Sequence, residues 1–198
     1  MVGEFGENGA DQTRKLNTKG TKNTKEDGSP NPSDTMKRVL KSQYLAALEM
    51  LRRAIRRCPE TLWDDPAFKN RFWRVAYHTL FYADLYLSRS EKEFKPWEKH
   101  RDEVNFLGAI PWKPKGRAKK FAPYSRKEVL EYLQRVAESV EARVESVDLN
   151  EPSGFSWLRF SKLELQIYNI RHIQHHAAQL IERVRQGTGK GVEWVGKK

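Results

Sequence analysis

The sequence has a single cysteine, Cys58, among its 198 residues. One thiol excludes an internal disulfide framework. Cys58 comes just before Pro59 at the end of a predicted helix, where the helix dipole does not activate a thiol, so we do not expect a nucleophile there. No apolar run reaches the roughly 18 residues that a membrane-spanning helix needs, and the N-terminus lacks the apolar core of a secretory signal. We therefore expect a cytoplasmic protein without a membrane segment.

Several catalytic signatures are also missing. The sequence contains no HExxH, no GxSxG and no Walker A motif, which excludes the usual zinc-protease helix, the nucleophile elbow and the P-loop. A di-iron carboxylate bundle needs a glutamate three residues before a histidine on two helices. No histidine of this chain has one, so a di-iron site is excluded as well.

Positive charge is unevenly distributed. The net charge is +11, yet residues 1–33 are balanced, with five basic and five acidic side chains. Residues 104–127 hold seven Lys or Arg and no acid. Such a segment attracts anions of any kind, so a solvated loop, a site for an anionic substrate or cofactor, and a nucleic-acid contact all stay open. No recognised nucleic-acid motif supports the last of these. The five basic residues of interest are Lys113, Lys115, Arg117, Lys119 and Lys120.

The chain divides into a tail and one domain. Residues 1–33 are rich in Gly, Asn, Thr, Lys and Asp and have almost no large apolar side chains, a composition typical of a disordered tail. Residues 34–198 are long enough for one good-sized hydrophobic core. We expect the tail to lie outside that domain.

Four amphipathic helices are predicted in the domain from apolar residues spaced three and four apart. They span about 34–57, 66–88, 125–147 and 161–187. Asp65 before Pro66 predicts the start of the second helix, and capping boxes begin at Ser125 and Ser161. Gly187 suits the position just after the last helix. Nothing reads as a strand, and the two long connections predict an all-α, antiparallel four-helix bundle.

Three of the five histidines fall where a divalent metal could use them. His172 and His176 are four residues apart on one helix, so they project from the same face. His78 takes the place of an apolar residue on the second helix and should point inward. Three neutral imidazoles that converge between helices leave a coordination position open for water or substrate. We read His175, which projects about 100° away from its neighbour, as a surface residue, and His100 as a bystander.

Two amides are candidates to orient these imidazoles. Asn169 lies one turn before His172, and Gln179 lies one turn after His176. Either could hold a histidine tautomer by a hydrogen bond behind the metal ligand. The alternative is that the pair forms only a polar helix edge. The inward His78 favours the site, because burying an unpaired imidazole is costly.

The helix order and two segments resemble the DinB/YfiT-like superfamily over about residues 36–186. The segments are AYHTLFYADLYL, which holds His78, and RHIQHHAAQLIERVR, which holds His172, His176 and Gln179. The resemblance implies a four-helix bundle with a long crossover connection, a divalent metal (often zinc or nickel) on those three histidines, and frequently a homodimer. Characterised members of that superfamily include S-transferases that use bacillithiol or mycothiol and a mycothiol-dependent isomerase.

A three-histidine metal with an open position can lower the pKa of a bound water or thiol. No helix side chain is an evident general base, so the metal itself would supply the nucleophile. We therefore favour a metal-dependent enzyme acting on a small molecule, either a transferase using a low-molecular-weight thiol or, less strongly, a hydrolase. The rival is a non-catalytic, stress-associated bundle with a structural metal. An enzyme needs a pocket beside the metal, for which Tyr77, Phe81 and Tyr82 are candidates, and the five basic residues would draw in an anionic thiol or substrate.

Overall fold

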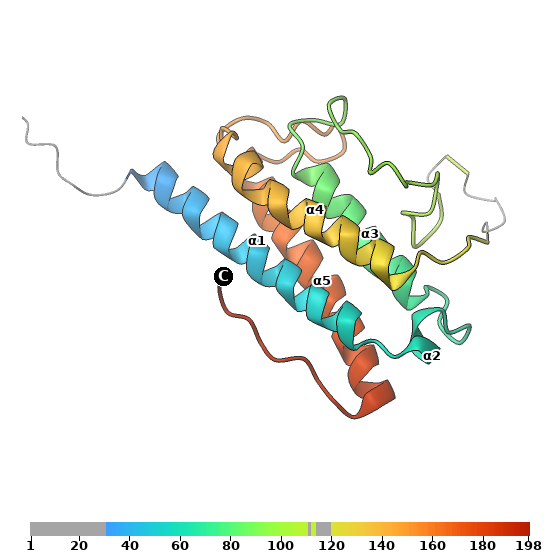
Figure 1. Ribbon diagram of the computed structural model, residues 1–198. Coiled ribbons are helices and arrows are strands. Elements are labelled where there is room, and N and C mark those ends of the chain that lie inside the picture. Colours follow the sequence, from blue (N-terminus) through green and yellow to red (C-terminus); the bar gives the residue numbers. More distant parts are fainter. Residues whose placement is uncertain (1–30, 111, 114–119) are drawn as a thin grey trace, which may run out of the picture. The chain divides into compact units, whose positions relative to one another are not determined.

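The computed structural model describes residues 31–110, 112–113 and 120–198, so most of the predicted tail lies outside the described residues. Within them the chain is all-helical, as predicted, with isolated bridges but no strand. None of these helices is long and apolar enough to cross a membrane. The helices, labelled in Figure 1, are α1 (Pro32–Arg57), α2 (Glu60–Trp63), α3 (Phe72–Tyr86), α4 (Arg126–Glu145) and α5 (Lys162–Thr188).

The helix starts follow local side-chain caps. The side chain of Asn31 accepts a hydrogen bond from the backbone N–H of Ser33, so α1 begins at Pro32, two residues before its predicted start. The capping box at Ser125 is present and opens α4. Ser161 likewise accepts from the N–H of Glu164 and opens α5.

The predicted start of the second long helix was wrong. The Asp65 carboxylate accepts from the N–H of Ala67 at 2.9 Å, but this bond closes a turn, and α3 begins only at Phe72. The intervening chain is held by aromatic anchors instead. The Trp63 indole donates to the Tyr124 carbonyl at 2.8 Å, and the Trp73 indole donates to Asp64 at 2.7 Å. Burying these rings with their N–H groups paired overrides the local helix-start signal.

The C-terminal end of α5 also differs from the prediction. Gly187 lies inside the helix, and the residue that ends it is Gly189, with a φ of 70°. Its N–H donates to the Arg185 carbonyl at 2.8 Å. Glycine adopts this left-handed backbone conformation at little cost. Both Gly187 and Gly189 fit the sequence pattern expected at the end of a helix.

The four long helices lie side by side (Figure 1). Helix α1 packs against α4 and α5, and α3 packs against the same two helices. Fully buried side chains from each helix meet in the core, among them Leu51, Leu80, Val136 and Ile173. The connection between α3 and α4 adds Trp97, whose ring stacks on Tyr132 with centroids 4.7 Å apart. That connection is therefore part of the folded body and positions groups beside α3.

Candidate metal centre

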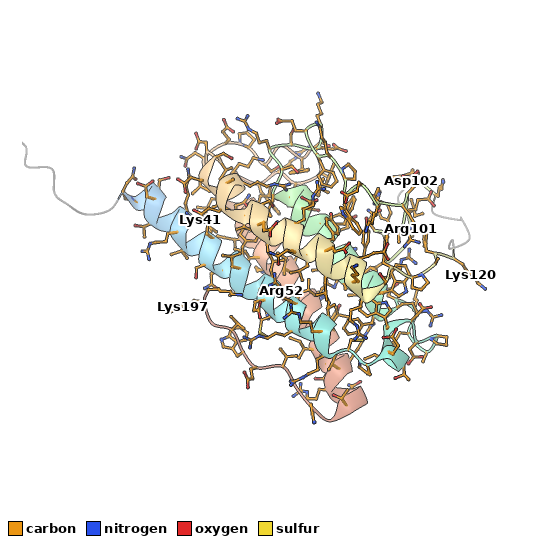
Figure 2. All side chains as sticks on the ribbon, in the orientation of Figure 1. Lys41, Arg52, Arg101, Asp102, Lys120 and Lys197 are labelled. Carbon is orange, nitrogen blue, oxygen red and sulfur yellow. The ribbon has the colours of Figure 1, made fainter. Side chains whose placement is uncertain are left out.

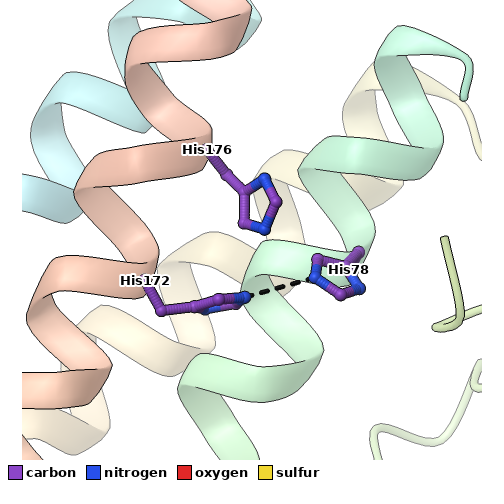
Figure 3. Close-up of side chains that lie close together, drawn as sticks. All are labelled: His78, His172 and His176. Atoms are coloured by element: carbon purple, nitrogen blue, oxygen red, sulfur yellow. Dashed lines mark hydrogen bonds between the residues drawn. The ribbon is translucent and has the colours of Figure 1, made fainter. Parts of the chain in front are cut away.

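His78 of α3 and His172 and His176 of α5 come together between the two helices (Figure 3). All three are half-buried, and one ring nitrogen from each lies within 4.8 Å of one from each of the others. Nε2 of His78 and Nε2 of His172 are 3.2 Å apart. This spacing suits ligands that share one ion at about 2.0–2.1 Å from each nitrogen.

A hydrogen bond to the backbone fixes the tautomer of His78. Its Nδ1 lies 2.6 Å from the backbone carbonyl of Asn105. A carbonyl oxygen can only accept, so Nδ1 carries the hydrogen and Nε2 keeps a lone pair directed toward His172. Asn105 belongs to the connection between α3 and α4, and a backbone carbonyl leaves no signal in the sequence. Sequence reasoning therefore missed this partner.

Gln179 orients His176. Its Oε1 lies 2.9 Å from Nδ1 of His176, and its Nε2 lies 2.9 Å from Nε2 of the exposed His175. The amide oxygen accepts, so His176 carries its hydrogen on Nδ1 and has a lone pair on Nε2. In Figure 3 the His176 ring lies over the gap between the other two histidines.

Asn169 occupies a different place. It is fully buried, and its amide donates to the Ala83 carbonyl at 3.1 Å. Its Oδ1 and the Nδ1 of His172 are both buried, and neither makes a hydrogen bond in the described part of the protein. Asn169 as the partner of His172 thus stays a prediction.

Burial keeps the cluster neutral. It lowers the pKa of His78 to about 4, although the Asn105 carbonyl opposes the shift. Burial, aided by the neighbouring histidines, lowers the pKa of His172 to about 3, and it also lowers the pKa of His176. Neutral imidazoles are the form that binds metals, so the cluster is ready to coordinate at neutral pH.

A cavity of about 910 Å³ lies beside the cluster. Phe81 and Tyr82 line it, as does His100. The Tyr82 ring separates the cavity from the histidines, with its centroid 4.7 Å from that of His78 and 5.7 Å from that of His172. Tyr77 is not among the lining residues, because it is fully buried and its hydroxyl bonds Nδ1 of His100 at 2.6 Å.

The basic segment is described only in part. Lys113 is exposed and forms an ion pair with Glu103 at 2.5 Å, at the edge of the cavity. Lys120 is exposed on the same connection (Figure 2). Lys115, Arg117 and Lys119 lie outside the described residues.

The sequence profile of the DinB superfamily matches residues 43–180. The chain belongs to the DinB superfamily. The matched span contains all three clustered histidines and Gln179, which confirms the resemblance inferred from the sequence. Neither the curated proteins nor the solved structures gave a match to this DinB-superfamily chain.

Proposed function

We propose that this DinB-superfamily protein is a metal-dependent enzyme whose single divalent ion is held by His78, His172 and His176. The observation that carries the proposal is the set of three neutral imidazoles, two of which are fixed with a lone pair on Nε2. Zinc is the first candidate and nickel the second, because imidazole suits both. The proposal also includes an antiparallel arrangement of the four long helices and a homodimer.

The donor set fits a catalytic ion better than a structural one. In the described ranges, no fourth His, Cys, Asp or Glu joins the cluster. Structural zinc sites have four protein ligands, whereas catalytic sites have three and keep one position for water or substrate. An ion bound there would act as a Lewis acid and lower the pKa of a coordinated water or thiol.

The surrounding residues would orient the reaction. The Asn105 carbonyl and Gln179 hold two of the imidazoles in the ligating tautomer. Tyr82 contacts the histidines and also lines the cavity, so an electrophile in the cavity would lie across the Tyr82 ring from the ion. We favour transfer to that electrophile from a low-molecular-weight thiol, with hydrolysis second. The basic residues at 113–120 would attract the carboxylates of such a thiol.

One observation favours a non-catalytic alternative. The clustered histidines do not line the large cavity, although His172 lines a separate, more open pocket of about 520 Å³. A stress-associated bundle that binds metal without turning over a substrate would need no more access than this.

Turnover in a screen of low-molecular-weight thiols against model electrophiles tests the proposal. We expect activity that is lost on metal removal, restored by zinc or nickel, and abolished in His78→Ala. Gln186→Ala is the control, since Gln186 is exposed on the same helix and outside the cluster. Activity that survives both metal removal and His78→Ala would contradict the proposal.

A further inference from the structure

The cavity beside the histidines has an unusual lining. Seven of its thirteen described lining residues are Phe, Tyr or Trp, and three are carboxylic acids, namely Glu91, Asp102 and Glu103. No lysine or arginine is among these thirteen residues. In a chain of net charge +11, a described lining that is rich in aromatic rings and carboxylates calls for a specific explanation.

The basic residues near the cavity are engaged elsewhere. Arg101 precedes Asp102 in the sequence (Figure 2), yet its guanidinium lies 3.7 Å from the Tyr124 ring centroid and donates to the Ala122 carbonyl at 2.7 Å. Lys99 pairs with Glu131 at 3.0 Å. Lys113 pairs with Glu103, so Glu91 and Asp102 are the acids on which the argument rests.

The Arg74 side chain is also engaged by other groups. It donates to the backbone carbonyls of Val104 and Phe106 at 3.2 and 2.6 Å, and its guanidinium lies over the Phe121 ring. These contacts fix the chain on either side of Asn105. Asn105 lines the cavity, and its carbonyl contacts His78. The Arg74 side chain thus holds this segment in place through hydrogen bonds to its backbone.

The segments that carry Glu91 and Trp157 are also held by hydrogen bonds. Gly154 has a φ of +83°, and a Cβ there would lie 2.3 Å from the Arg89 carbonyl oxygen. The Glu91 N–H donates to the Gly154 carbonyl at 3.3 Å, and the buried Lys162 ammonium donates to the carbonyls of Arg89 and Ser153. These bonds join the segment that carries Glu91 to the segment that carries Trp157, a rim residue that is 49% exposed.

We propose that this cavity binds an organic cation, an alkylammonium or quaternary ammonium group, on the electrophilic co-substrate. Aromatic ring faces attract such cations, and nearby carboxylates add a long-range attraction. The volume is in the range of small-molecule sites. The inference rests on the proposed function and deepens it, because a cationic electrophile in the cavity would complement an anionic thiol drawn in by the basic segment.

A neutral isostere separates charge recognition from simple apolar burial. Choline and 3,3-dimethylbutan-1-ol have the same shape, and only choline is charged. We expect calorimetry on the full chain to show choline binding at least about tenfold more tightly, the scale of a desolvated cation–π contact. Equal affinity of the two, binding of neither, or a preference for a trimethyl-lysine peptide over choline would overturn the inference.

Paired variants locate the binding. Trp157→Ala and the double variant Glu91→Gln/Asp102→Asn should each weaken choline binding several-fold. Trp194→Ala removes a more exposed indole outside the cavity lining, and Glu98→Gln removes an acid that pairs with Arg135 outside the cavity; neither should change the affinity. Choline binding that is unchanged in both cavity variants would overturn the inference, and the isostere comparison on the unmutated protein stands even if a variant misfolds.

The same titration distinguishes this inference from the proposed function. Binding is measured on metal-depleted and metal-loaded protein, so it needs no turnover. Selective choline binding without thiol-transfer activity supports the cavity's specificity and counts against the transferase. Activity toward neutral or anionic electrophiles alone, without choline binding, counts against the cavity's specificity and leaves the transferase intact.

Discussion

At the residue scale, protonation decides what the three histidines can hold. Burial lowers the pKa of His78 to about 4 and that of His172 to about 3. A lowered histidine pKa means that the neutral, metal-binding form persists as the pH falls through the ordinary value of about 6.5. Protons therefore begin to compete with a metal only near the folded-state values.

We expect the metal-loaded protein to keep its ion at about pH 5.5 and to release it as the pH approaches 4, because that is where His78 takes up a proton. Equilibrium dialysis over a pH series, with circular dichroism to confirm folding, measures this. Release with a midpoint near the ordinary histidine pKa would contradict the assignment of these buried imidazoles as ligands.

Gln179 gives a second prediction at this scale. Replacing it with alanine removes the acceptor that fixes Nδ1–H of His176, so the metal affinity should fall about 10–100-fold. Gln186→Ala is the matched control, since Gln186 lies on the same helix and, among the described residues, bonds Glu182 and not the cluster. Competition with a chromophoric chelator measures both. Equal metal affinities of the two variants would show that Gln179 does not contribute to the metal site.

At the scale of helices, a buried ion pair ties α3 to α4. Asp84 is 1% exposed, and its carboxylate accepts from Arg143 at 2.7 Å and from the Tyr132 hydroxyl at 3.0 Å. Removing the Asp84 carboxylate leaves the partly exposed Arg143 guanidinium without its charged partner. The tie holds α3, and with it His78, in place.

Asp84→Asn should therefore lower the free energy of unfolding by on the order of 3 kcal/mol, somewhat less than for a fully buried pair because Arg143 is partly exposed. Glu141→Gln, which breaks the exposed pair with Lys41, should cost about 0–1 kcal/mol. Urea denaturation compares the two. Similar decreases in the free energy of unfolding of the two variants would show that the Asp84 pair stabilises the fold no more than an exposed pair does.

The four long helices could be predicted because their apolar stripes repeat over many turns, and the start of α4 because its capping box is local. The start of α3 could not, since Asp65 caps a turn and the helix position is set by rings distant in sequence, such as Tyr124. Within the site, His78, His172 and His176 were predicted from the spacing of the α5 pair, the inward placement of His78 and the family resemblance. The Asn105 carbonyl and the cavity's acids come from the irregular connection, which carries no periodic signal.

At the scale of the whole molecule, the charge of +11 coexists with an acidic cavity. Lys113 and Lys120 are the described members of the basic segment, and both are exposed. Their field would guide an anionic thiol toward the site, an effect that weakens with salt.

Replacing both lysines with serine should raise the KM for a carboxylate-bearing thiol by about 2–10-fold at low salt, with kcat unchanged, because only the encounter is affected. Lys197→Ser removes an exposed charge near the C-terminus (Figure 2) and should leave the KM unaltered. Steady-state kinetics at two salt concentrations tests this. If the lysine pair instead governs a salt-sensitive DNA shift while turnover is unchanged, the segment binds nucleic acid.

The metal content of the protein is the most direct test of the account. Protein purified without a histidine tag is analysed for transition metals, alongside the double variant His172→Ala/His176→Ala and the control Gln186→Ala. We predict one divalent ion per chain, zinc or nickel, in the unmodified protein and in Gln186→Ala, and none in the double variant. Equal metal in all three proteins would contradict the three-histidine site on which the proposed function rests.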